Sequence, residues 1–135
     1  MASKKVLLIL LLLVMLGIAS VAIGIDAYMD KISSKRDITL IGDINNNPSV
    51  YDGKSVTVIG EYRGWQSELG HGPPVTRSDW ILRDETGEIY ITGKSPRLDP
   101  IRDIGHNLLV TGIVKISKYN YPYIDAKNIR SEKLE

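Results

Sequence analysis

The chain contains no cysteine, no phenylalanine and only two histidines among its 135 residues. Without a thiol there is no disulfide, no thiolate metal site and no lipid attached through sulfur. The two histidines, His71 and His106, lie far apart in the sequence, and no nucleophile motif accompanies them. The sequence therefore predicts a protein that is not an enzyme and that binds neither a metal nor a cofactor.

The chain also lacks a charge excess of either sign. It has 17 lysines and arginines against 16 aspartates and glutamates. Proteins that hold long nucleic acids nonspecifically neutralise phosphates and usually carry a clear basic excess. The near-neutral charge therefore argues against bulk binding of nucleic acid.

One long apolar run is present, from Val6 to Ile25, and Lys4 and Lys5 precede it. A helix of about twenty residues covers about 30 Å, the thickness of the hydrocarbon core of a bilayer. Basic residues before such a run favour an amino terminus in the cytoplasm. The sequence predicts a single-pass membrane protein with its carboxy-terminal domain outside the cytoplasm. Small residues near position 20 also fit the cleavage site of a signal peptide.

The chain divides into three parts by composition. Residues 1–25 are the predicted membrane anchor or an uncleaved signal, and residues 26–36, which are polar and mixed in charge, form a predicted stalk. Residues 37–135 suffice for one small domain with a single modest core.

Alternation of apolar and polar residues predicts five strands in this domain. The second and third strands are expected to form a hairpin around the turn from Asp84 to Gly87, with Gly87 in the left-handed region. Gly60 is expected at a bulge that curves the first strand. The predicted strands are residues 55–62, 80–84, 88–92, 108–116 and 121–126.

Two short helical segments accompany the strands. Residues 40–46 place Leu40, Ile41 and Ile44 on one side, so we expect this segment to close one end of a barrel. Residues 99–105 begin with a capping aspartate, continue with a proline and end at a glycine, which together are typical of a short helix.

These features resemble the OB fold, an all-β, five-stranded Greek-key barrel. The resemblance covers residues 39–129 and is carried by YDGKSVTVIG at 51–60, WILRDETGEIYI at 80–91 and LLVTGIV at 108–114. The hairpin resembles the nucleic-acid-binding, tRNA anticodon-binding-like type of OB domain. The predicted transmembrane helix before the barrel is similar to the apolar leader of exported bacterial OB-fold proteins. The residues of these stretches alternate towards the core or form a bulge or a turn. They therefore specify the fold and not the ligand.

A membrane-anchored haem chaperone shares the layout of anchor followed by OB barrel. That family holds haem through a histidine beyond the barrel strands, and this chain has no histidine after His106. The resemblance therefore does not extend to haem.

The resemblance to OB barrels implies a ligand lying across the second and third strands, between two loops. The solvent face of the hairpin is expected to show Ile81, Arg83, Tyr90 and Thr92, whereas Trp80 is expected in the core. Aromatic and basic side chains in such a groove can stack bases, sugars or peptide side chains. The predicted groove residues are Arg63, Trp65, Arg77, Arg83, Tyr90, Lys118, Tyr119 and Tyr123.

Two functions remain open on these grounds. The leading hypothesis is a non-catalytic, membrane-anchored, extracytoplasmic module that binds a protein, peptide or glycan. The alternative is a single-stranded nucleic-acid-binding protein. The distribution of charge distinguishes them, because a nucleic-acid groove concentrates basic residues on one face.

Overall fold

The computed structural model describes residues 3–17 and 37–132, which fall into two compact units, Met1–Asp37 and Ile38–Glu135. In the first unit, residues 4–17 form a helix whose large apolar side chains, from Val6 to Leu16, are 46% to 66% exposed. Across the two described ranges, no helix combines the length and the apolar character needed to cross a bilayer. The predicted run from Val6 to Ile25 ends outside the described residues.

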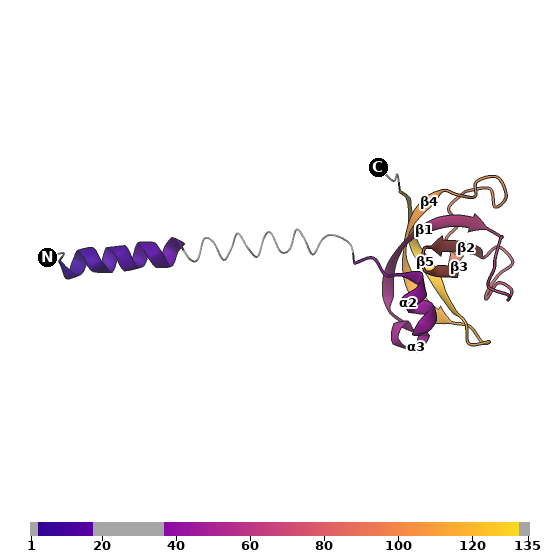
Figure 1. Cartoon of the computed structure of the whole chain (residues 1–135), viewed down its shortest axis with the longest axis horizontal. Helices are drawn as coiled ribbons and strands as arrows, with labels where there is room; N and C mark the ends of the chain where they lie inside the picture. The colour runs from indigo at the N-terminus through magenta and orange to yellow at the C-terminus, as the bar shows by residue number, and fades with distance from the viewer. Residues whose placement is uncertain (1–2, 18–36, 133–135) are drawn as a thin grey trace. The chain divides into compact units, whose positions relative to one another are not determined.

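The second unit is a closed barrel of five strands (Figure 1). Around the barrel the order is β1-β2-β3-β5-β4, with β3 and β5 parallel and every other neighbouring pair antiparallel. This arrangement confirms the predicted all-β barrel of the OB type. The strands are β1 (Ser55–Gly64), β2 (Trp80–Asp84), β3 (Gly87–Gly93), β4 (Asn107–Ile116) and β5 (Pro122–Ser131).

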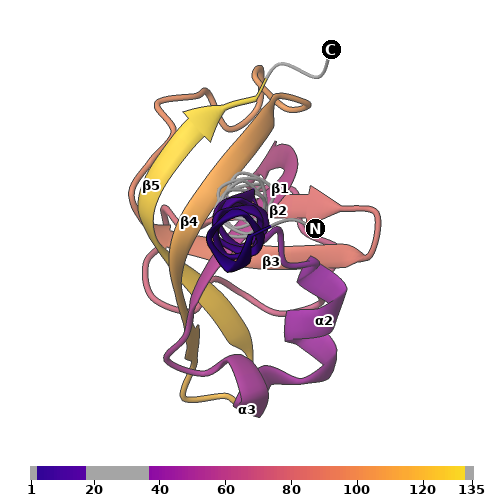
Figure 2. The same ribbon diagram turned by 90° about the vertical axis from the view of Figure 1, so that its left-hand side faces the viewer.

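Two short helices precede the barrel strands. Helix α2 (Ile41–Asn46) confirms the helix predicted at 40–46, and α3 (Pro48–Tyr51) follows it (Figure 2). The side chains of Ile41 and Ile44 are fully buried in the core, where they pack with residues from the barrel strands. Helix α2 therefore supplies part of the core, as expected from its apolar side.

The helix predicted at 99–105 does not form. The Asp99 carboxylate accepts the backbone N–H groups of Ile101 and Arg102, so the capping interaction is present. The segment nevertheless makes only turns before Gly105, whose φ is 105°. A cap and a proline begin a turn, but they cannot extend it without an apolar face to bury.

The core of the barrel lies where the alternation predicts. Trp80, Leu82 and Val58 are buried, and Trp80 is a core residue as expected. Its ring centroid lies 5.4 Å from that of Tyr62, and its indole N–H donates to the carbonyl oxygen of Lys94 (3.2 Å).

Gly60 serves a different purpose from the predicted one. The irregularity in pairing between β1 and β2 falls between Tyr62 and Gly64, so Gly60 is not at a bulge. A Cβ atom on Gly60 would lie 2.5 Å from the carbonyl oxygen of Arg83. The glycine is therefore required because β2 passes too close for any side chain.

The hairpin turn also differs from the prediction, since Gly87 does not have a positive φ. The turn is closed instead by the Asp84 carboxylate, which accepts the backbone N–H groups of Thr86 (2.7 Å) and Gly87 (3.1 Å). Aspartate at the first position of a tight turn commonly makes such bonds.

Candidate ligand groove

The loop between β1 and β2, residues 65–79, folds over the outer face of the β2–β3 hairpin. The backbone N–H of Glu68 donates to the Glu88 carboxylate (2.9 Å), and the Tyr90 hydroxyl donates to the carbonyl oxygen of His71 (3.0 Å). Ile81 and Tyr90 were predicted to face solvent, but they are 0% and 6% exposed. Neither residue belongs to the main core cluster, so this burial arises from cover on the outside of the barrel.

The arginine on this face is held by two carboxylates. Arg83 donates from Nε (3.0 Å) and Nη2 (2.7 Å) to the buried Glu88, and its Nη2 also lies 3.1 Å from a carboxylate oxygen of Glu68. The hydrogen bond to Glu88 raises the pKa of the Arg83 guanidinium above its usual value. The positive charge on the hairpin face is therefore neutralised within the protein.

Aromatic side chains gather where this loop meets the loop between β4 and β5, residues 117–121. The rings of His71 and Tyr121 stack with centroids 3.7 Å apart and planes within 2° of parallel. The His71 ring also lies 5.6 Å from that of Tyr90. In the second loop, the Lys118 ammonium lies 4.9 Å from the centroid of the Tyr119 ring, which is 66% exposed. The two loops thus form one aromatic and cationic edge.

The structure brings only some of the predicted groove residues together. Arg83, Tyr90 and Tyr123 share one region, since Tyr90 and Tyr123 are register partners on β3 and β5. Lys118 and Tyr119 lie in the adjoining β4–β5 loop.

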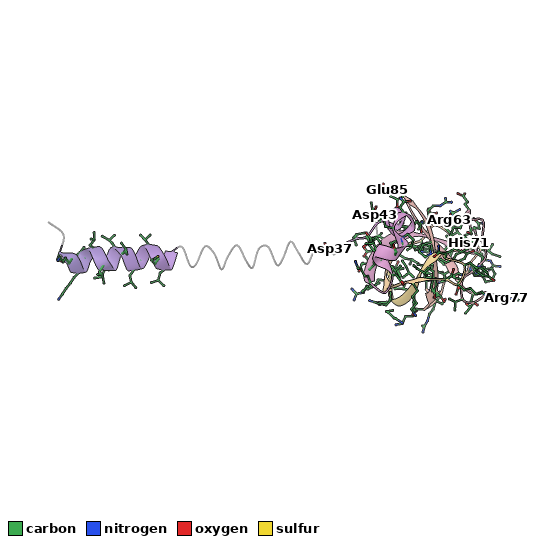
Figure 3. All side chains as sticks on the ribbon, turned by 90° about the horizontal axis from the view of Figure 1, so that it is seen from below. Asp37, Asp43, Arg63, His71, Arg77 and Glu85 are labelled. Carbon is green, nitrogen blue, oxygen red and sulfur yellow. The ribbon has the colours of Figure 1, made fainter. Side chains whose placement is uncertain are left out.

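The other three predicted residues are less closely associated with this region. Arg63 is bound to Glu61 (3.0 Å) and Gln66 (3.3 Å) on and beside β1. Trp65 is 59% exposed. Arg77 makes no ion pair within the described ranges and lies at the edge of the domain, away from Asp43 and Glu85 (Figure 3).

Four residues that contribute to the groove were not among the predicted ones. Glu88 had a signal in the sequence, because it lies two positions before Tyr90 and so shares its face of β3. His71 and Tyr121 lie in the two loops that were expected to flank the groove, but no pattern indicated that they stack, and Glu68 had no signal. These contacts depend on how the β1–β2 loop folds.

No protein-family model matches the chain, and no curated protein matches it significantly. Among solved structures, the hypothetical protein ygiW from E. coli is 18% identical, with 71% of this chain and 90% of that chain covered and a TM-score of 0.48. Asparaginyl-tRNA synthetase from Pyrococcus horikoshii is 14% identical, with 73% of this chain and 24% of that chain covered and a TM-score of 0.50. Its complex with asparaginyl-adenylate gives a TM-score of 0.49.

The likeness is one of fold. At 14% identity the match to the synthetase shows a shared fold and nothing more. This chain spans about a quarter of the length of the synthetase.

Proposed function

We propose that this chain is a non-catalytic OB-fold binding module whose ligand is a single-stranded nucleic acid. The observation that carries the proposal is the stack of His71 on Tyr121, beside the Lys118 and Tyr119 pair. Aromatic rings and cations at the edge of an OB groove are a platform for stacked bases, each worth about 1 to 3 kcal/mol. The fold and these side chains support the same class of ligand.

Two groups of the β1–β2 loop stand where such a ligand would bind. The His71 imidazole covers the Tyr121 ring as a base would. The Glu68 carboxylate accepts from the Arg83 guanidinium, which could otherwise bind a phosphate. Glu68 is 81% exposed, so its ion pair contributes little to holding the loop closed. A ligand would therefore displace His71 and Glu68. Its base would stack on Tyr121 and its phosphate would bind Arg83.

Fluorescence anisotropy with a labelled single-stranded oligonucleotide and the full chain tests this proposal. We expect binding that weakens steeply as salt rises. Tyr121→Ala should weaken binding about 5- to 150-fold, the loss of one stacked base, and Tyr121→Phe should preserve it, because phenylalanine keeps the stacking face. His71→Ala and Glu68→Gln should each tighten binding, since both remove a competitor of the ligand. Equal affinity for the Tyr121→Ala variant and wild type, or no binding at low salt, would refute the proposal.

A protein, peptide or glycan is a second candidate ligand. It is favoured by the neutralisation of Arg83 by Glu68 and Glu88, which leaves little free positive charge on the hairpin face. On this hypothesis, the full chain captures a partner from membranes, Tyr121→Ala loses that partner, and no oligonucleotide is retained at physiological salt. Tyr121→Ala impairs ligand binding on either hypothesis, so the retention of an oligonucleotide at physiological salt separates the candidates.

We also propose that the run from Val6 to Ile25 anchors the chain in a membrane, with residues 26–36 as a stalk and residues 37–135 outside the cytoplasm. The proposal is supported by Lys4 and Lys5 before the run and by the exposed apolar side chains of the helix at 4–17. Protease added to intact cells or protoplasts should digest the domain. Protection of the domain until the cells are lysed would show the opposite orientation.

A further inference from the structure

A pocket of about 280 Å³ lies between the segment after β3, the start of β4 and the end of β5. It shares no residue with the groove on the β2–β3 hairpin, and none of its lining residues is acidic. Its polar lining consists of Lys94, Ser95, Arg97, His106, Asn128 and Ser131.

The wall of this pocket is fixed to the core at both ends. The buried Trp80 donates its indole N–H to the carbonyl oxygen of Lys94 (3.2 Å). The buried Tyr62 donates its hydroxyl to the carbonyl oxygen of Leu98 (3.5 Å). The segment from Lys94 to Leu98 therefore presents its side chains from a rigid support, which reduces the ordering cost of binding.

Within this wall, Arg97 has a φ of 58°, which side chains other than glycine and asparagine rarely adopt. Its backbone N–H donates to the Ser95 hydroxyl (3.3 Å), which stabilises the turn locally. A left-handed residue with a Cβ costs about 1 to 2 kcal/mol. An arginine at a position that glycine would fill without strain points to a use for its guanidinium group.

The permanent positive charges of the pocket belong to Lys94 and Arg97. Neither Lys94 nor Arg97 makes an ion pair within residues 37–132. Asp79 lines the adjoining hollow, and its carboxylate accepts three hydrogen bonds from its own loop. His106 Nε2 lies 4.0 Å from a carboxylate oxygen of Asp103.

From this geometry we propose that the pocket binds the phosphate group of a small phosphorylated molecule. The guanidinium fork of Arg97 matches two phosphate oxygens, the Lys94 ammonium adds a second positive charge, and the hydroxyl and amide groups provide further hydrogen bonds. The volume is at the lower limit of ligand pockets, about 300 Å³, so it fits a small ligand. This site is independent of the proposed nucleic-acid groove.

The test is an NMR titration of the full chain with inorganic pyrophosphate at constant ionic strength. Amide signals of Ser95, Arg97 and Ser131 should shift saturably. Arg97→Gly removes the guanidinium and also relieves the positive φ, so we expect affinity to fall at least about tenfold while the melting temperature stays equal or rises. Loss of binding without loss of stability cannot be attributed to unfolding.

Arg77→Ala is the matched control, because Arg77 is exposed and does not line the pocket. It should leave pyrophosphate affinity unchanged, and Arg97→Gly should leave oligonucleotide binding unchanged. Undiminished affinity in Arg97→Gly, or no saturation up to about 10 mM, would overturn the proposal.

Discussion

The hairpin turn caps helix α2, and removing that cap is the most informative perturbation of the fold. Leu40 stands at the N-cap of α2 and provides no side-chain hydrogen bond. The first two helical N–H groups are satisfied from the turn instead: that of Ile41 by the Asp84 carboxylate (2.7 Å) and that of Gly42 by the Thr86 hydroxyl (2.7 Å). Because the other oxygen of Asp84 closes the turn, one carboxylate joins helix and hairpin.

The magnitude of this effect follows from the bonds that Asp84→Ala removes. Removing the cap leaves the partly buried N–H of Ile41 without an acceptor, which costs about 1 to 3 kcal/mol. The N–H groups of Thr86 and Gly87 can donate to water instead, so losing their bonds to Asp84 adds a smaller cost. We expect a decrease of about 3 kcal/mol in the free energy of unfolding, which for a domain of this size lowers the melting temperature by roughly 15 °C.

Urea unfolding followed by circular dichroism measures this decrease. Thr86→Ala should cost about 1 kcal/mol and Thr86→Ser much less, because serine keeps the hydroxyl that Gly42 requires. Glu85→Ala, in the same turn but exposed, is the control and should change stability by about 0.5 kcal/mol or less. If Asp84→Ala unfolds at the same urea concentration as Glu85→Ala, the turn does not cap the helix.

Three further predictions concern the barrel. Gly60→Ala should destabilise the domain by about 2 kcal/mol or more in urea unfolding, because its Cβ would lie 2.5 Å from a β2 carbonyl oxygen. Leu82→Ala should cost about 2 to 4 kcal/mol by the same measurement, since the side chain is fully buried, and an unchanged midpoint would contradict its core position. Hydrogen bonds from Lys127 and Lys115 hold the pKa of the Asp125 carboxyl below its usual value. Its contribution to stability is therefore present above the usual pKa of an aspartate and is lost as the pH falls through the lowered pKa. Acid unfolding should therefore be steeper in wild type than in Asp125→Asn.

The fold was predictable because its signals are local. The apolar positions of β1 alternate in the sequence, and every second residue of this strand is buried. The turn residues Asp84 and Gly87 mark the hairpin between β2 and β3. Strand β5 extends to Ser131, beyond the predicted end at 126, because its second half pairs with β4. Pairing with a neighbouring strand can hold residues in a strand even where their own apolar and polar alternation is weak.

The groove was less predictable because period two assigns a side chain to a face of the sheet but does not say what covers that face. Ile81 and Tyr90 are on the expected outer face, yet both are buried beneath the β1–β2 loop. The cover depends on pairs between residues far apart in the sequence, such as His71 with Tyr121. No short-range pattern encodes such pairs.

The loop that covers the groove is held by interactions of a size that a ligand can replace. An exposed ion pair such as Arg83 with Glu68 contributes up to about 1 kcal/mol, the Tyr90 hydroxyl bond about 0.5 to 1.5 kcal/mol and an aromatic pair about as much. Two stacked bases offer about 2 to 6 kcal/mol in return. Each 1.4 kcal/mol spent on opening the loop weakens apparent binding about tenfold. Removing the His71 ring should therefore strengthen oligonucleotide binding by up to about tenfold, whereas a ligand that binds elsewhere on the barrel would be indifferent to this ring.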